Sequence, residues 1–367
     1  MRKIPIIAMI LPLAIAAAEA DVKVEDFFGP EYSCVHHVDM AGYETLFNAT
    51  TEAGKKKITD PRKEDSYVET RKEVFNWLRL SGIPRIREFG IAQRNLEVNG
   101  SKMIITRFRA LTTAAASHDL LTVLASENPA DIDWIAALPQ DVTFAVSGTI
   151  SMRKLWDAVM PIYSKMGSIL FLMERLQANI GQDELLDSIE GRFGFALNIV
   201  NVSGEFPHVK LLISLPDRNG TLHNMMKSCG LQSISGTGDT LLNSEGNYIV
   251  RLSPGRVDIY SEIVSVGSAF EYYTGTKSRL GDSSDFKAMR NTIGDSGNLA
   301  IWVARNTLSS NFESKDRCNP APGMNAPVLA VAYLSDTHCD FTLISGIGPQ
   351  FITWVTLALS PNMEFEF

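Results

Sequence analysis

Residues 85–110 read RIREFGIAQRNLEVNGSKMIITRFRA, and the dipeptide Asn99-Gly100 lies at their centre. Both residues tolerate a positive φ, which is the conformation that a two-residue turn between antiparallel strands requires. The stretches Arg85–Val98 and Met103–Ala110 flank this turn and have the character of strands. The sequence therefore predicts a long β-hairpin here, and with it an antiparallel sheet.

Strand and helix patterns continue on both sides of this hairpin. Together they predict an α+β fold, in which helices pack on antiparallel sheets. A charged loop is predicted from Lys55 to Asp65. The predicted helices are Glu69–Leu80, His118–Ala125 capped by Ser117, a long helix from Ser151 to about Ile180 that is interrupted at Pro161, Asp183–Ile189, Thr221–Cys229 and Asp285–Ile293. The other predicted strands are Tyr32–Val38 and the pairs Phe193–Val200 with Val209–Leu215, Tyr248–Leu252 with Val257–Tyr260, and Val328–Leu334 with Phe341–Ile344.

Two stretches of alternating apolar residues share one pattern. Val142, Phe144 and Val146 form the first, Leu299 and the alternate residues up to Val303 form the second, and each leads into a helix with a Ser or Thr cap. This pattern is consistent with a duplicated strand–helix–hairpin unit. The alternative is that many α+β proteins contain such units without any duplication.

The composition is that of an ordinary globular protein. Of the 367 residues, 45% are apolar and 21% are charged. These values exclude a disordered chain, a collagen-like chain and a disulfide-dense miniprotein. The net charge of −8 argues against a dedicated nucleic-acid-binding protein, because phosphate contacts need a basic surface. We therefore expect no nucleic-acid partner.

The first twenty residues have the pattern of a secretory signal peptide. Arg2 and Lys3 form a positive start, an apolar stretch runs from Ile4 to Ala18, and Ala18-Glu19-Ala20 is a small-x-small cleavage site. The alternative is an uncleaved N-terminal anchor. No Cys lies near the cleavage site, so a lipoprotein is not expected. We expect a periplasmic or secreted protein with no transmembrane span after cleavage.

The length predicts more than one domain in the mature chain. A stretch with Pro and Asp, Glu127–Gln140, marks one boundary, and the pattern restarts near Arg279. We predict an N-terminal α+β domain at 21–135, a middle α+β domain at 136–275 and a C-terminal α+β domain at 276–367, after the signal peptide at 1–20.

The four cysteines would meet an oxidising compartment after export. Three pairings are possible, and we favour Cys318 with Cys339, because the Pro-rich segment between them can fold back. Cys34 would then pair with Cys229. The alternative is that some of the cysteines are free, buried thiols.

Three short motifs resemble catalytic sequences. Asp295-Ser296-Gly297 matches the aspartic-protease tripeptide, but a strand follows it rather than precedes it, so we interpret it as a turn and Asp295 as a weak catalytic candidate. Ser151 and Ser284 each begin a Ser-x-x-Lys tetrad, in which a Lys amine can activate a Ser hydroxyl. The Ser-Asp-Asn and Lys-Thr-Gly elements of penicillin-binding enzymes are missing, so both serines are interpreted as helix N-caps.

Metal and cofactor motifs are weaker still. Cys34, His36, His37 and Asp39 alternate between the two sides of one strand, and no second ligand pair completes a set, so we expect no metal site. The Gly-rich segments lack a P-loop Lys or a Rossmann context, so we expect no cofactor.

The helix after Pro161 is the most unusual feature. It is apolar on nearly every face, which indicates either a central helix or one that something else covers. Flexible Met side chains suit an adaptable groove for an apolar ligand. The candidate ligand-binding residues are Met160, Met166, Phe171 and Met173; the alternative is core packing.

Residues 138–146, LPQDVTFAV, resemble the start of an uncharacterised family of exported bacterial proteins. The resemblance extends through Asp285–Met289 and the strand at Asn298–Val303, and so covers about residues 138–305. It implies bacterial export and an α+β repeat. The family has no established activity, so no residue role comes with it.

The leading hypothesis is a non-enzymatic envelope or secreted protein that binds a protein partner or an apolar or lipid ligand. The alternative is a secreted hydrolase, a protease or glycan-acting enzyme, that uses carboxylates in an interdomain cleft. Acidic residues available for acid–base work include Asp183, Glu184, Asp187 and Glu190.

Overall fold

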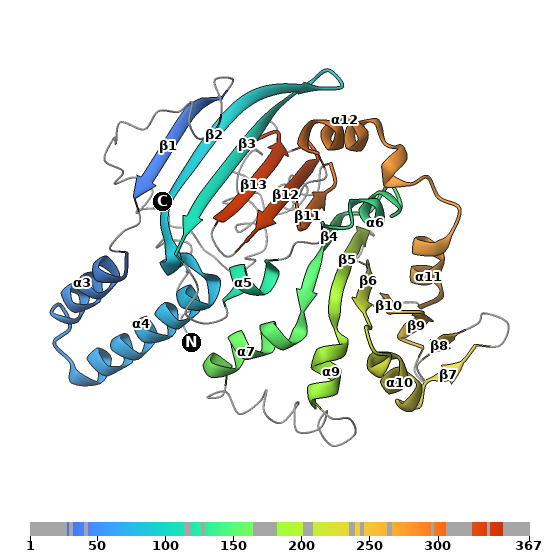
Figure 1. Ribbon diagram of the computed structural model, residues 1–367, viewed down its shortest axis with the longest axis horizontal. Helices are drawn as coiled ribbons and strands as arrows, with labels where there is room; N and C mark the ends of the chain where they lie inside the picture. Colours follow the sequence, from blue (N-terminus) through green and yellow to red (C-terminus); the bar gives the residue numbers. More distant parts are fainter. Residues whose placement is uncertain are drawn as a thin grey trace.

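A single antiparallel sheet of thirteen strands organises the computed structural model of the chain (Figure 1). The strand order is β1-β2-β3-β13-β12-β11-β4-β5-β6-β10-β9-β8-β7. The structure describes residues 28, 32–39, 43–113, 119–125, 129–163, 182–200, 208–234, 239–242, 246–262, 266–294, 297–305, 325–335 and 338–347.

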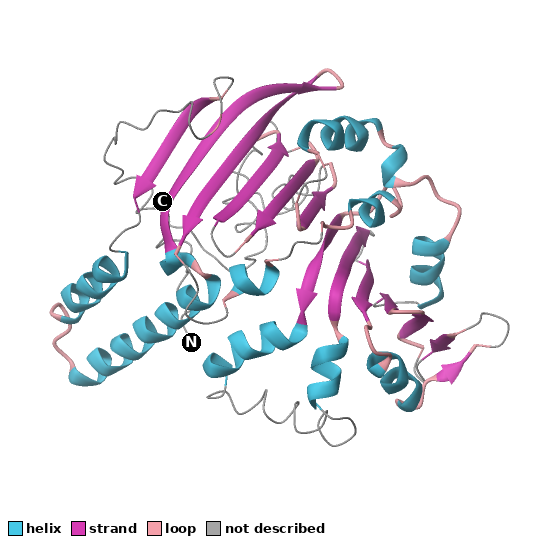
Figure 2. Ribbon diagram, in the orientation of Figure 1, coloured by secondary structure: helices cyan, strands magenta, loops and turns pink. Residues whose placement is uncertain are grey.

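The predicted α+β class is confirmed, with helices packed on the sheet (Figure 2). The strands are β1 (Ser33–Asp39), β2 (Ile86–Val98), β3 (Ser101–Thr112), β4 (Phe144–Ser151), β5 (Glu190–Val200), β6 (His208–Pro216), β7 (Gln232–Ser233), β8 (Thr240–Leu242), β9 (Tyr248–Ser253), β10 (Arg256–Glu262), β11 (Leu299–Val303), β12 (Val328–Leu334) and β13 (His338–Ser345).

The described helices lie around the sheet and at its ends (Figure 2). They are α3 (Tyr43–Lys55), α4 (Pro61–Ser81), α5 (Leu120–Leu124), α6 (Ile132–Ala136), α7 (Met152–Tyr163), α9 (Gln182–Ser188), α10 (Thr221–Ser228), α11 (Val266–Thr274) and α12 (Ser284–Ile293), with 3₁₀ turns η2 (Ile83–Arg85) and η3 (Leu280–Asp282).

The Asn99-Gly100 hairpin is confirmed. β2 and β3 pair up to Val98 opposite Ser101, and the two turn residues between them have φ values of 48° and 77°. Both values are positive, as a type I′ turn requires. The other three predicted strand pairs are confirmed as β5 with β6, β9 with β10, and β12 with β13.

Three helix starts differ from the predictions. The charged stretch predicted as a loop to Asp65 is helical from Pro61, because the Asp60 side chain accepts a hydrogen bond from the Arg62 N–H and caps α4. α5 is capped by Asp119 rather than Ser117. Ser284 is the first residue of α12 and not its N-cap, since Ser283 takes that position.

One face of the sheet, which we call the helix face, holds the main core. α6, α11, η3 and α12 cover it, with Ile135, Tyr272, Leu280 and Phe286 buried against the strands. Strand residues repeat with period two, so alternate residues share this face. Its buried strand residues include Ala92, Ile105, Ala145, Ala196, Leu212, Tyr260, Ala300, Trp302, Leu329 and Ile344.

The strand order is similar on the two sides of the pair β4–β11, with seven strands on the β4 side and six on the β11 side. Proceeding outward, β4, β5, β6 and the hairpin β10-β9 lie on one side, and β11, β12, β13 and the hairpin β3-β2 lie on the other. These two central strands are the ones whose shared pattern suggested a duplicated unit, and they pair from Leu299 opposite Gly148 to Val303 opposite Phe144. The three segments predicted as domains all contribute strands to this sheet.

The predicted disulfides are wrong. Cys339 and Cys229 are free thiols in the structure. Cys339 lies within β13, opposite Leu334 of β12 and Ala110 of β3. Hydrogen bonds to the strands on both sides fix the backbone of Cys339. A disulfide partner would therefore have to approach its sulfur across a face of the sheet. Cys318 lies outside the described residues.

The two free thiols are expected to differ in reactivity. Burial, together with the charge of Asp340, raises the pKa of Cys339 to about 12, whereas Cys229 is exposed. Because the thiolate is the nucleophile, iodoacetamide at pH 8 should alkylate Cys229 at least about tenfold faster than Cys339. Peptide mass spectrometry of timed samples measures both rates. A Cys318–Cys339 cross-linked peptide in a non-reducing digest would contradict the structure.

Candidate functional site

A cavity of about 290 Å³ lies at the end of the sheet where β4 leads into α7. It is formed by α5 and the residue after it, the end of β4, the first turn of α7, the start of β5 and Arg218, which follows β6. Its lining residues are Val123, Ala125, Thr149, Ile150, Ser151, Lys154, Glu190, Gly191 and Arg218.

Backbone hydrogen bonds fix the position of the first turn of α7. The N–H of Met152 donates to the carbonyl of Ile189, at 2.9 Å, and so ties the helix start to the segment before β5. The Ser151 hydroxyl accepts a hydrogen bond from the N–H of Lys154, at 3.4 Å. Ser151 therefore caps this turn, as the sequence predicted, and Lys154 is held at the cavity.

The cavity combines an apolar wall with polar groups. Val123, Ala125 and Ile150 supply the apolar part. The Thr149 hydroxyl is buried and has no hydrogen-bond partner within the described structure. A buried hydroxyl without a partner costs free energy, and a polar atom of a bound ligand would remove that cost.

The acidic residues near the cavity are already paired with arginines. Glu190 pairs with Arg218, and both side chains are largely exposed. Arg153 donates to Asp183 at 2.6 Å and to Asp187 at 3.0 Å. The hydrogen bond from Arg153 lowers the pKa of Asp187, so this carboxyl stays ionised to a lower pH than an ordinary Asp.

Lys154 differs from these paired groups. It is exposed, and within the described part of the chain its amine makes no ion pair. It is therefore the cavity-lining cation that is available to a negatively charged ligand.

Small and polar residues lie buried on the helix face next to α6. β5 places Gly194 opposite Ser147 of β4 and Ser214 of β6, and Ser214 lies opposite Asp258 of β10. Such small side chains leave room above the strands. Trp134 of α6 fills part of that room, because a Cβ atom on Gly194 would lie only 2.5 Å from its ring.

Arg256 and Asp258 are held together beside this tryptophan. The Ser214 hydroxyl donates to Asp258 Oδ1, and Arg256 Nε donates to the Ser214 oxygen. Arg256 Nε also lies 3.4 Å from Asp258 Oδ1, and its guanidinium lies 5.9 Å from the centre of the Trp134 ring. Arg256 is therefore restrained at one end, while its terminal nitrogens Nη1 and Nη2 donate to none of the described residues.

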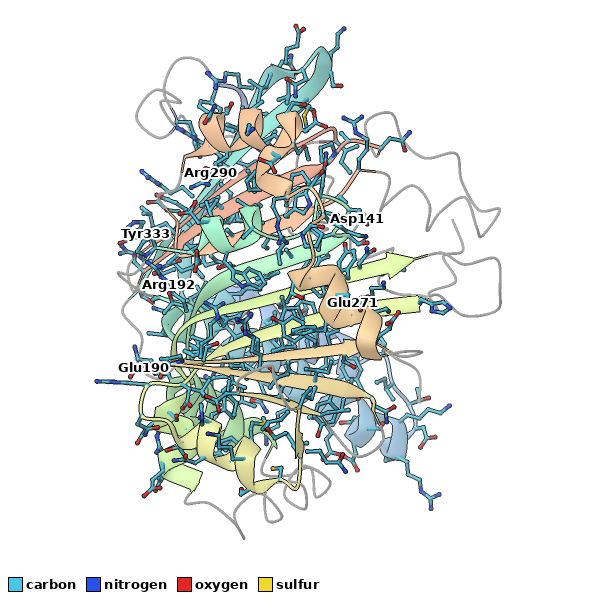
Figure 3. All side chains as sticks on the ribbon, turned by 90° about the vertical axis from the view of Figure 1, so that its right-hand side faces the viewer. Asp141, Glu190, Arg192, Glu271, Arg290 and Tyr333 are labelled. Carbon is cyan, nitrogen blue, oxygen red and sulfur yellow. The ribbon has the colours of Figure 1, made fainter. Side chains whose placement is uncertain are left out.

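Figure 3 shows how the labelled polar residues are distributed. Glu190 and Arg192 of β5, Tyr333 of β12 and Arg290 of α12 lie toward one side of this view, and Asp141 and Glu271 lie toward the other.

Of the predicted ligand-binding residues, Met160 is the one that lies within the described part of the chain. Met160 is half-buried in α7, on the helix that begins at the cavity but near its other end. Asp295, Met166, Phe171 and Met173 lie outside the described residues. Of the acidic residues named for acid–base chemistry, Glu190 lines the cavity.

Sequence reasoning missed Trp134, Arg192, Arg256 and Asp258. One signal was present: Gly194 and Ser214 interrupt otherwise apolar strands with small residues, which often indicates close approach of another group. The register that joins them to Arg256 was not readable from local patterns.

The described residues contain no group of three or more His, Cys, Asp or Glu side chains that could hold a metal ion. No described helix is both long enough and apolar enough to span a membrane. The chain matches no family model, no curated protein and no solved structure.

The contact between Trp134 and Gly194 can be tested by a double-mutant cycle. Gly194→Ala should lower the free energy of unfolding by about 1–3 kcal/mol, because the added methyl overlaps the indole ring. In a Trp134→Ala background the same substitution should cost little, because the space is then open. Urea unfolding of the four proteins measures this coupling. Equal effects in both backgrounds would show that the ring does not lie on Gly194.

Proposed function

We propose that the chain is a non-enzymatic, exported bacterial binding protein, and that its cavity holds a small ligand with an apolar body and one anionic group. The export part of this proposal rests on the signal-peptide pattern and on the family resemblance. The ligand part rests on the cavity.

The observation that carries the ligand proposal is the position of Lys154. Lys154 and Arg218 are the two cations that line the cavity. Arg218 is paired with Glu190, whereas the Lys154 amine makes no ion pair within the described structure. A carboxylate or phosphate beside Lys154 would form a charge-assisted hydrogen bond. The apolar wall of Val123, Ala125 and Ile150 suits a short hydrocarbon group.

Carboxylate and phosphate share this chemistry, so two matched probes separate them. Isobutyrate and isobutyl phosphate have the same apolar body, and isothermal titration measures the binding of each to the mature protein. We expect at least one of them to bind. Lys154→Met should weaken that binding about tenfold or more, because it removes the charge and keeps the side-chain stem.

Lys102→Met is the matched control, since Lys102 is exposed at the far end of the β2–β3 hairpin. It should bind the probes like the wild type. If neither probe binds the wild type, or if both variants weaken binding equally, the cavity is not the anion site that we propose.

A secreted hydrolase is the second candidate, favoured by one observation: Ser151 and Lys154 line the same cavity. In an acyl transfer the Ser151 oxygen would attack a carbonyl carbon, a neutral Lys154 amine would take the hydroxyl proton, and that proton would pass to the leaving group. The capping hydrogen bond from the Lys154 N–H to this oxygen favours the structural role instead.

A comparison of alanine variants in the two Ser-x-x-Lys tetrads tests the hydrolase candidate. Ser284→Ala changes the tetrad in α12, which does not line the cavity, so it serves as the matched control. If the protein is a hydrolase of this type, Ser151→Ala should abolish cleavage of p-nitrophenyl acetate and Ser284→Ala should not. We expect no difference between the two variants, because Ser151 acts as a cap. Asp295→Ala tests the Asp-Ser-Gly motif in the same assay.

A further inference from the structure

The helices α3 and α4 form a hairpin, which we call the arm, that extends beyond the ends of strands β1, β2 and β3 (Figure 1). Leu80 in the last turn of α4 packs with Val123 of α5 and Ala158 of α7, so this end of the arm is anchored. The turn between the two helices, residues 56–60, is the tip of the arm. Because a helix rises about 1.5 Å per residue, the 21 residues of α4 place the tip roughly 30 Å from the anchor.

Contacts between its two helices hold the arm together. The buried Arg71 of α4 donates hydrogen bonds to the hydroxyls of Thr51 and Thr50 of α3, at 2.9 and 2.8 Å. Its guanidinium also lies 4.1 Å from the centre of the Phe47 ring, which in turn lies 4.9 Å from that of Phe75. A buried cation with several partners fixes α3 against α4. The tip is therefore carried by a packed unit.

Basic residues gather at the tip of the arm. Residues 55–63, KKKITDPRK, carry five basic side chains and one acidic, in a chain whose net charge is −8. Lys56, Lys57, Arg62 and Lys63 are exposed, and their side chains make no ion pair or hydrogen bond within the described part of the chain. The tip thus presents four cations to solvent.

The acidic residues close to the tip do not neutralise these cations. The Asp60 carboxylate accepts the N-cap hydrogen bond of α4, at 3.1 Å, and Glu64 pairs with Lys55 at 3.3 Å. Glu52 and Asp65 lie about one helical turn behind the tip, on α3 and α4. The outermost part of the arm is therefore positive, although the rest of the chain is acidic.

We propose that the tip of the arm docks on an anionic membrane surface, with its free cations among the lipid phosphates. This inference goes beyond the proposed function, because the tip contributes no residue to the cavity. Clusters of Lys and Arg bind anionic lipid surfaces, and each cation near the surface raises the affinity about fivefold. The proposed export of the chain brings it to such a surface.

The length of the arm favours a membrane over other anionic partners. A membrane is flat and extends beneath the whole molecule, so it would repel an acidic body that came close to it. The arm holds the body roughly 30 Å away, which is several times the screening length of about 8 Å at physiological salt. A nucleic acid needs a basic surface that follows its backbone, and a single turn does not supply one. The partly exposed Ile58 adds an apolar side chain for the headgroup boundary.

Sedimentation of the mature protein with lipid vesicles tests this inference. We expect binding to vesicles made of equal amounts of phosphatidylglycerol and phosphatidylcholine, and none to vesicles of phosphatidylcholine alone. Binding should fall as NaCl is added, because salt screens exposed charges. The triple variant Lys56→Gln, Lys57→Gln and Lys63→Gln should bind the anionic vesicles at least about tenfold more weakly.

Two matched variants separate the tip from net charge and from lysine itself. The triple variant Arg87→Gln, Lys102→Gln and Lys287→Gln removes the same charge from exposed residues of β2, β3 and α12. It should bind the anionic vesicles like the wild type. Replacement of the three tip lysines by arginine keeps the charge and should also keep the binding.

Several results would overturn the membrane inference. They are absence of binding to the anionic vesicles, equal binding to the neutral vesicles, and an equal loss of binding in the two glutamine variants. Tighter binding of a DNA duplex or of polyglutamate at the same salt concentration would assign the tip to a nucleic acid or an acidic protein instead.

These results are independent of those for the cavity. Lys154→Met should leave vesicle binding unchanged, and the glutamine variant of the tip should bind the isobutyl probes like the wild type. If the isobutyl probes fail to bind while the vesicles bind through the tip, the cavity proposal is wrong and the membrane inference stands. The reverse pattern refutes the membrane inference alone.

Discussion

The pairing of β4 with β11 is the interaction on which the rest of the structure depends. These strands pair over five residue pairs, from Leu299 opposite Gly148 to Val303 opposite Phe144. Every strand on one side of the sheet connects to the other side through this pair alone. Ala145 and Ala300 are fully buried in it, and their small size lets α6 and α12 lie close to the strands. Those helices then decide which part of the helix face stays open.

The candidate site lies at one end of this sheet. Ser147 and Gly194 lie beneath α6, since the Ser147 hydroxyl oxygen accepts a hydrogen bond from the N–H of Asp131 and the Trp134 ring covers Gly194. The cavity forms beside them because β4 ends and α7 begins next to α5.

Much of the fold was predictable because its signals are local. Asn99-Gly100 determines a turn through its own backbone preferences, and the apolar alternation of β4 and β11 is visible within five residues. The pairing of β3 with β13 was not predictable in this way, because it depends on residues more than two hundred positions apart. The same limit hid the site. Arg256 and Asp258 become informative only when the register brings them to Ser214, and Cys339 shows no local sign that its thiol is free.

The position of β3 has a consequence for how the chain is made. Its outer partner, β2, lies just before it across the tight turn and is available at once. Its inner partner is β13, so Arg109 meets Asp340 only after nearly the whole chain has been synthesised. Until then one edge of the hairpin offers unpaired backbone groups, which attract other strands. Closing a loop of this length is also slow. A chain built in this order completes its sheet only when synthesis is almost finished.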